Sequence, residues 1–252
     1  MEHKLFDNER IDDLQYKGLK IIQKKDGFCF GVDAVLLANF AEVKKGDKII
    51  DLGTGTGIIP ILLAGKTEAS KITGLEIQHD MAEMAQRSVC MNNLQDRAEI
   101  VCGDIKESLQ YFSPSSFNIV VTNPPYMNSG GGLVNPQDMK AISRHEIMCN
   151  LEDVIKASSR LLMPGGQFVM VHRPERLVDI IVLMRNYSIE PKYMRFVHPS
   201  PYKKSNIILV KGFRGGKPQL KMMPPLYVYD ENGEYSREIN EIYCRSEVKT
   251  NE

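Results

Sequence analysis

No charge of one sign dominates this chain of 252 residues, because 32 lysine and arginine residues face 32 aspartate and glutamate residues. A protein that binds nucleic acid over its whole surface would carry a clear positive excess, so this balance argues against that class. The sequence also lacks the run of about 20 mainly apolar residues that a membrane-spanning helix needs. Its longest stretch without charge, residues 108–137, is repeatedly interrupted by Pro, Gly, Asn and Ser. We therefore expect no membrane insertion.

Cysteine is scarce, and its spacing indicates neither metal binding nor disulfides. No two cysteines stand in a CxxC pair, so a zinc knuckle or a disulfide framework is not expected. The N-terminal sequence MEHKLFDNERIDD is charged where a signal peptide would have an apolar core. These features predict a protein of the reducing cytoplasm that holds no metal. The five cysteines are Cys29, Cys90, Cys102, Cys149 and Cys244.

Apolar runs alternate with helical patterns from about residue 48 to residue 190, which is typical of parallel strands joined by helices. The sequence therefore predicts a Rossmann-like α/β fold with helices on both faces of a mostly parallel sheet. A late β-rich run, 205–212, is expected to form an antiparallel pair with residues near 192–198 at the edge of the sheet. The expected strands are 48–51, 71–77, 98–102, 117–122 and 167–172; the expected helices are 58–64, 80–92, 151–162 and 174–187, the third stopping at Pro164-Gly165-Gly166.

A glycine-rich turn, Asp51-Leu52-Gly53-Thr54-Gly55-Thr56-Gly57, joins the first of these strands to the first helix. Glycines there permit a tight turn and a close approach of the backbone to a ligand. The dinucleotide fingerprint would require a glycine at position 58, which is Ile58, and the Walker A ending is also absent. A phosphate site and a nicotinamide-dependent reductase are therefore poor fits, and an ordinary strand-to-helix turn remains the alternative.

Two carboxylates follow the next two strands. Glu76 ends the second strand, and Asp104 follows the third strand after a glycine. Strand ends of a doubly wound sheet converge on one crevice, where ligands bind. Glu76 could accept hydrogen bonds from both hydroxyls of a ribose, and Asp104 could meet the amino group of an adenine. The joint placement of these acids with the turn after Asp51 predicts a nucleoside-shaped pocket that has no phosphate site.

This pattern resembles the class I S-adenosylmethionine (SAM)-dependent methyltransferases over roughly residues 30–212. The resemblance implies that the 51–57 turn holds the methionine part of SAM, while Glu76 binds the ribose and Asp104 the adenine. Asp33 lies near the cofactor in this resemblance, although it would serve equally well as the N-cap of an expected helix.

The resemblance also implies a seven-stranded sheet whose last strand is antiparallel. On this basis we expect a class I methyltransferase domain over residues 48–215. A preceding segment, 1–47, would pack on the cofactor site, and residues 216–252 would form a C-terminal appendage.

The sequence Asn123-Pro124-Pro125-Tyr126 follows the fourth strand. It could be a turn that merely ends a strand. Within this scaffold it suits methyl transfer to an NH2 group, whose delocalised lone pair makes a weak nucleophile. If Asn123 Oδ1 and the Pro124 carbonyl accept the two hydrogens, the nitrogen can pyramidalise and direct its lone pair at the methyl group. Tyr126 could stack on a planar acceptor.

The NPPY motif resembles that of methyltransferases acting on adenine N6, guanine N2 or the amide of glutamine. Further segments are similar to the bacterial tRNA1(Val) adenine-37 N6-methyltransferase family, which implies tRNA as the substrate. The glutamine enzymes usually carry a longer N-terminal helical domain than the 47 residues present here. The segments that carry this similarity are Asp12-Asp13-Leu14, Ile21-Ile22-Gln23, the run from Phe30 to Leu37, Arg144-His145-Glu146, Pro164-Gly165-Gly166, the run from Val171 to Leu177, and Val197-His198-Pro199.

From residue 191 to residue 229 the chain has eight lysine and arginine residues, several interleaved aromatic residues and no acidic residue. Such a run is usually a solvated surface, but it could also contact the phosphates of RNA without reading sequence. The resulting prediction is a SAM-dependent N-methyltransferase acting on an adenine of tRNA. The alternatives are a protein glutamine-N5 methyltransferase, an rRNA guanine-N2 methyltransferase, and a non-catalytic RNA-binding protein that retains the fold.

Overall fold

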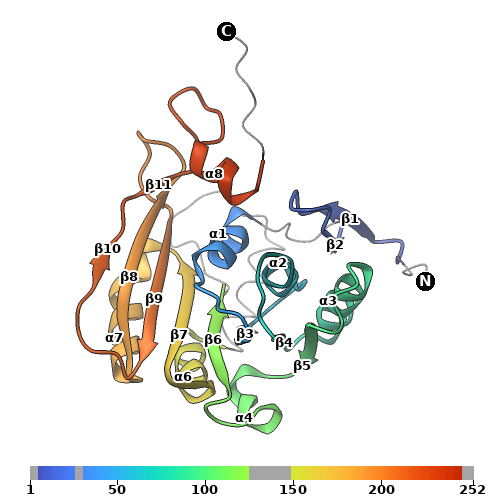
Figure 1. The fold of residues 1–252 in the computed structure, drawn as a ribbon, viewed down its shortest axis with the longest axis horizontal. Helices are drawn as coiled ribbons and strands as arrows, with labels where there is room; N and C mark the ends of the chain where they lie inside the picture. Colours follow the sequence, from blue (N-terminus) through green and yellow to red (C-terminus); the bar gives the residue numbers. More distant parts are fainter. Residues whose placement is uncertain (1–4, 26–30, 125–148, 246–252) are drawn as a thin grey trace.

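The computed structural model describes residues 5–25, 31–124 and 149–245, and these residues build one large central sheet. Its strands lie in the order β10-β8-β9-β7-β6-β3-β4-β5, with β11 also paired to β8 (Figure 1). The expected seven strands are all present, and two strands of two residues each extend the sheet beyond β8. The seven are β3 (Lys48–Leu52), β4 (Lys71–Glu76), β5 (Ala98–Cys102), β6 (Phe117–Thr122), β7 (Leu162–His172), β8 (Ile189–His198) and β9 (Ile207–Arg214).

The expected mostly parallel sheet with a late antiparallel strand is confirmed, whereas that strand and its partner do not form the edge of the sheet, as was expected. Strands β5, β4, β3, β6 and β7 pair in parallel, and β9 is antiparallel to both of its neighbours, β7 and β8. The late antiparallel strand therefore lies inside the sheet, between β7 and β8, and the two short strands β10 (Lys221–Met222) and β11 (Leu226–Tyr227) cover the outer side of β8.

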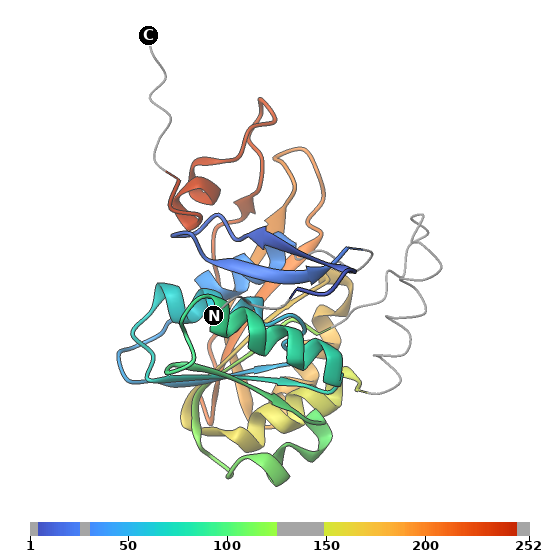
Figure 2. The ribbon, with the colours of Figure 1, turned by 90° about the vertical axis from the view of Figure 1, so that its right-hand side faces the viewer.

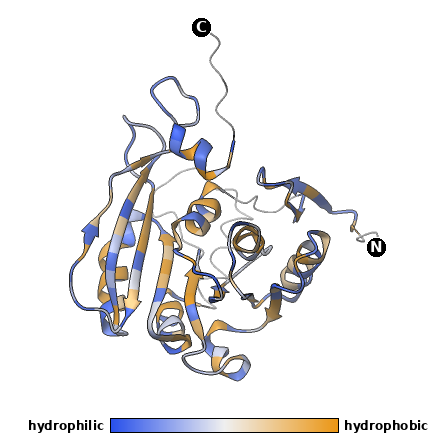
Figure 3. Ribbon diagram, in the orientation of Figure 1, coloured by the Kyte–Doolittle hydropathy of each residue, from blue (hydrophilic) through white to orange (hydrophobic). Residues whose placement is uncertain are grey.

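Helices cover both faces of the sheet because successive strand residues point to opposite sides. Ile49 and Val121 pack against one helical layer, whereas Ile50 and Val120 pack against the other. Figure 3 shows the resulting concentration of hydrophobic residues on the central strands. The first layer is α1 (Val32–Phe40), α2 (Ile58–Lys66) and α3 (His79–Met91), and the second is α4 (Ser108–Tyr111), α6 (Leu151–Leu161) and α7 (Leu177–Asn186).

The role of Pro164-Gly165-Gly166 as a helix stop was wrong, although the helix ends within one residue of its expected end. Helix α6 ends at Leu161, and Pro164-Gly165-Gly166 lies inside strand β7 instead of stopping the helix. Leu162 pairs with Phe117 and Gln167 with Ile119, so the intervening residues form a bulge opposite a single residue of β6. Gly165 has a φ of 75°, which suits glycine, so the signal taken for a helix stop is that of a bulge.

The N-terminal hairpin, β1 (Glu9–Asp13) and β2 (Lys20–Lys24), lies alongside α3 (Figure 2). The Ile22 N–H donates to Ser88 Oγ at 2.9 Å. The Asn92 amide of the same region accepts from Lys20 N and donates to Lys20 O, at 2.9 and 2.7 Å. The backbone N–H and C=O groups on the open edge of β2 are therefore hydrogen-bonded to side chains of α3 and its C-cap.

The C-terminal residues share the core of the central domain. Leu226, Ile239 and Ile242 are buried in the cluster that contains α1. Helix α8 (Arg237–Ile242) is tied to β8 by Arg195, whose guanidinium bonds both carboxylate oxygens of Glu238 at 2.5 and 2.7 Å. The domain boundaries at residues 47 and 215 stay predictions. No helix in the described parts of the chain is both long and apolar enough to cross a membrane.

Arg87 holds the hairpin against α3 through a bidentate ion pair with Glu9, at 2.7 and 2.8 Å. Its Glu9 partner is only 3% exposed, and the bond from Arg87 holds the pKa of Glu9 below its ordinary value. Arg87→Ala is expected to lower the free energy of unfolding by about 3 kcal/mol, because it leaves a buried charge uncompensated. Chemical denaturation measures this loss.

The matched control is Arg237→Ala, which breaks a pair with Glu241 whose side chains are 82% and 62% exposed. Its expected loss is below about 0.5 kcal/mol. Equal small losses for the two variants would contradict the assigned role of Arg87.

Candidate active site

Parallel pairing brings the predicted site residues to one edge of the sheet. Glu76 pairs with Cys102 at the ends of β4 and β5, and Asp51 of β3 pairs with Val121 of β6. The carboxyl ends of these strands therefore lie side by side. A pocket opens at this edge, and four of the predicted residues line it: Gly53, Glu76, Asp104 and Pro124.

The three glycines of the glycine-rich turn have left-handed backbone conformations, and open space remains beside the backbone of the turn. Gly53, Gly55 and Gly57 have φ values of 77°, 56° and 83°, which other residues adopt only with strain. A Cβ on Gly57 would lie 3.0 Å from Ala85 of α3, so α2 and α3 pack closely there. At Gly55, by contrast, nothing lies within 4 Å of such a Cβ. The turn thus forms a cradle with room for a ligand.

Asp51 is fully buried beneath this turn. Among the described residues, neither of its carboxylate oxygens has a hydrogen-bond partner. Burial raises the pKa of Asp51 to about 7, the Thr54 hydroxyl nearby offsets this only in part, and the charge of Glu76 adds to it. A buried polar group without partners is costly. A cationic ligand would supply the missing partner, and SAM, with its ammonium and sulfonium groups, fits that requirement.

Glu76 links the turn to the end of β4. Its side chain is buried, with Oε2 accepting from Gly55 N at 2.9 Å and Oε1 accepting from Gln78 N at 2.9 Å. These two bonds fix the orientation of the carboxylate. Oε1 also accepts from Gln78 Nε2 at 3.5 Å. A carboxylate has about four acceptor positions, so Glu76 retains acceptor capacity for a hydroxyl of a ribose.

Asp104 has a local structural role as well as a place on the pocket. Its Oδ1 accepts from Lys106 N at 2.8 Å and so caps the short helix η1 (Ile105–Glu107). The pocket is also lined by Ile77 and Ile105, which the sequence interpretation overlooked. Each of them directly follows one of the two acids, and that repeated acid-isoleucine order was the available signal. Apolar side chains beside these acids suit a flat adenine ring.

Asn123 stands next to the cradle. Strand β6 ends at Thr122, whose Oγ1 donates to Leu52 O at 2.9 Å. Asn123 follows directly and is half-buried, while Pro124 is buried on the pocket. Tyr126 lies outside the described residues. The assignment of Asn123, Pro124 and Tyr126 to the methyl acceptor stays a prediction, as do the individual roles of the cofactor residues.

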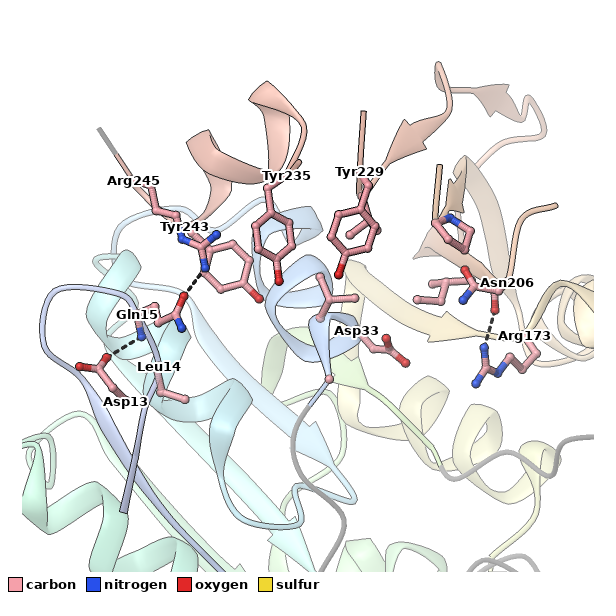
Figure 4. A pocket seen from close by; sticks show the side chains of 15 residues that line it. Asp13, Leu14, Gln15, Asp33, Arg173, Asn206, Tyr229, Tyr235, Tyr243 and Arg245 are labelled. Atoms are coloured by element: carbon pink, nitrogen blue, oxygen red, sulfur yellow. Dashed lines mark hydrogen bonds between the residues drawn. The ribbon is translucent and has the colours of Figure 1, made fainter. Parts of the chain in front are cut away.

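Asp33 lies apart from this group. Helix α1 begins at Val32 after Gly31, so Asp33 is in the first turn and the alternative role as N-cap was wrong. Its side chain lines a second cavity beside tyrosines of the C-terminal segment (Figure 4). A role for Asp33 in cofactor binding stays a prediction. Across residues 5–25, 31–124 and 149–245, no group of three or more His, Cys, Asp and Glu residues could hold a metal ion.

The raised pKa of Asp51 predicts that SAM affinity depends on pH. Below a pKa of about 7 the carboxyl is protonated and neutral, whereas a cationic ligand favours the ionised form. Affinity measured by calorimetry should therefore rise between roughly pH 6 and pH 8. Asp51→Asn should remove the part of this pH dependence that arises from titration of the Asp51 carboxyl. Identical pH profiles of SAM affinity for the wild type and the variant would contradict the assignment.

Comparison with known proteins agrees with this geometry. Residues 31–185 match the model of the family described as methyltransferase small domain. Among solved structures, a predicted O-methyltransferase from Agrobacterium tumefaciens has a TM-score of 0.70 at 24% identity, covering 85% of this chain and 97% of that one. A geranyl diphosphate methyltransferase in complex with SAM has a TM-score of 0.52 at 15% identity, covering 73% and 84%. These two likenesses show the fold.

Curated relatives share more sequence. A protein of Porphyromonas gingivalis, named tRNA1(Val) (adenine(37)-N6)-methyltransferase, is 30% identical over 204 residues, 79% of each chain. Proteins with the same name from Bacteroides thetaiotaomicron and Phocaeicola vulgatus are 33% and 27% identical, covering 62% and 77% of this chain and 65% and 81% of theirs. The protein is therefore a SAM-dependent methyltransferase that belongs to the methyltransferase small domain family.

Proposed function

We propose that the protein methylates the N6 amino group of adenine-37 in tRNA1(Val). The observation that carries this proposal is the position of Pro124, which lines the pocket beside Glu76 and Asp104 and directly follows Asn123 at the end of β6. Relatives with 79% coverage bear the name of this activity. The N6 group of adenine is an NH2 group with a delocalised lone pair, which is the kind of acceptor that this site suits.

The chain's contribution to the reaction is to position the amino group. SAM supplies an electrophilic methyl group when it is bound. Asn123 Oδ1 and the Pro124 carbonyl would each accept a hydrogen bond from the amino group that is methylated. The nitrogen lone pair would then point towards the cofactor pocket. No strong base is required, because the amino group loses its proton to water after transfer. An adenine in an RNA loop is already unstacked, which reduces the cost of bringing it to this edge.

The structure divides the basic segment seen in the sequence. Lys211 is buried and paired with Glu42 at 2.7 Å, and Arg195 is committed to Glu238. Lys203 and Lys204, in contrast, are exposed in the loop between β8 and β9. Since β8 runs parallel to β6, this loop lies at the same edge of the sheet as Asn123. These lysines are positioned to contact RNA phosphates near the acceptor.

Asn123→Ala should reduce the rate of methyl transfer at least about 100-fold, because one of the two positioning acceptors is lost. Affinity for SAM should change less than about twofold, because Asn123 is assigned to the acceptor and not to the cofactor. The assay combines labelled SAM with unmodified tRNA1(Val), with an rRNA fragment and with a release factor, followed by nucleoside and peptide mass spectrometry.

The matched control is Asn232→Ala, which removes an exposed asparagine from the turn before α8. It should retain wild-type transfer. Label in N6-methyladenosine of the tRNA supports the proposal. Label only in N2-methylguanosine of the rRNA, or only in glutamine of the protein, would contradict it.

A further inference from the structure

We propose that the cavity beside Tyr229 binds a second, unstacked nucleobase of the same RNA, next to the nucleotide that is methylated. This inference rests on the proposed function, since it requires an RNA substrate. The cavity is separate from the cofactor pocket and is lined by segments far apart in the sequence: the turn of the N-terminal hairpin, the start of α1, the ends of β7 and β8, and the C-terminal residues.

A column of stacked side chains forms one wall of this cavity (Figure 4). The rings of Tyr229 and Tyr235 are stacked, with centroids 5.1 Å apart and an angle of 22° between their planes. The Arg245 guanidinium lies 4.7 Å from the Tyr235 ring and 4.6 Å from the Tyr243 ring. Tyr229 is the end of the column that is nearest to Arg173 and Asn206, and it remains 39% exposed. A planar base can extend such a column by one more layer.

The column is held rigidly at the substrate edge. The Tyr229 N–H donates to Pro199 O at 2.8 Å, which fixes Tyr229 to the end of β8. Across the cavity, Arg173 follows β7 and donates from Nη1 to Asn206 O at 2.8 Å. Arg245 is also hydrogen-bonded to Gln15 of the hairpin turn. A surface fixed in this way loses little conformational entropy when a base stacks on it.

The charges of the cavity favour a base over a phosphate. Arg173 and Arg245 are balanced by Asp13 and Asp33, which also line it, so no excess of positive charge is directed at an anion. The carboxylate of Asp33 lies between Tyr229 and Arg173 in the view of Figure 4, where it can accept from an amino or imino group of a base. Aromatic faces combined with hydrogen-bonding groups are the chemistry that recognises unstacked RNA bases.

The position of the cavity matches a neighbouring nucleotide. Strand β7, which leads to Arg173, is the direct partner of β6, which leads to Asn123. Adjacent strands lie about 4.8 Å apart, so the acceptor position and the cavity lie within a few strand widths along one edge. The exposed loop that carries Lys203 and Lys204 joins β8 to β9 beside the cavity and can contact the phosphates between the two bases.

Tyr229→Ala is expected to raise the KM for the anticodon stem-loop RNA about tenfold, because one stacking face is lost. The value of kcat and the affinity for SAM should stay within about twofold, since Tyr229 touches neither the cofactor pocket nor Asn123. Tyr229→Phe keeps the ring and should behave as wild type. Tyr187→Ala, which removes a tyrosine before β8 at the opposite edge of the sheet, is the matched control and should leave the KM for RNA unchanged.

A second measurement identifies the stacked base. Each nucleotide next to the methylated adenosine is replaced in turn by an abasic residue, and KM is measured with the wild type and with Tyr229→Ala. At one position the abasic replacement should raise the KM of the wild type about tenfold and the KM of Tyr229→Ala less than about twofold. The reason is that both changes remove the same stacking contact.

The inference is overturned if the wild type methylates the RNA and Tyr229→Ala does so with the same KM. It is also overturned if, at every position, the KM increase caused by the abasic residue is as large in Tyr229→Ala as in the wild type. Transfer by the wild type to the release factor alone is a different result, because it contradicts the proposed function itself.

Discussion

Parallel pairing of β6, β3, β4 and β5 is the constraint on which the site depends. The pairs Asp51 with Val121 and Glu76 with Cys102 align the strand ends, so the cradle, both acids and Asn123 meet at one edge although they are far apart in sequence. The pairing persists because alternate strand residues are buried in two separate cores, one under each helical layer. A slip of one residue would exchange these faces, and it would also separate the groups assigned to the cofactor from those assigned to the acceptor.

The site holds a charge arrangement that is unfavourable until the ligand arrives. Asp51 is buried without a partner in the described residues, and its pKa in the fold is raised from 3.8 to about 7. The folded chain therefore binds more protons than the unfolded chain between these two values, and stability falls as pH rises through that window. A bound cation favours the ionised carboxylate and reverses this effect. If Asp51 has the role in cofactor binding assigned to it above, ligand binding and the stability of the fold are linked at this carboxylate.

The strands, the helices on both faces, and the clustering of Glu76, Asp104 and the glycine turn could be predicted, because periodicity and strand-end chemistry are local signals. The order of the strands in the sheet was not predicted. The bulge at Gly165 could not, because a glycine after a helix suits a stop as well as a bulge, and only the register with β6 distinguishes them. The place of Asp33 in a cavity apart from Glu76 and Asp104, and the stacking of Tyr229 on Tyr235, depend on how the C-terminal segment packs on α1 and β8. No local sequence pattern in the C-terminal segment, in α1 or in β8 indicates how these elements pack together.

The central claim is that the methyl acceptor is the N6 amino group of an adenine in tRNA. An RNA loop would bind at the edge of the sheet that carries Asn123, the loop with Lys203 and Lys204, and the tyrosine column. The most direct measurement is mass spectrometry of nucleosides from purified tRNA1(Val) of cells with and without this protein. N6-methyladenosine at position 37 should be present in the first and absent from the second. Unchanged N6-methyladenosine, together with loss of methylglutamine from a release factor, would contradict the account.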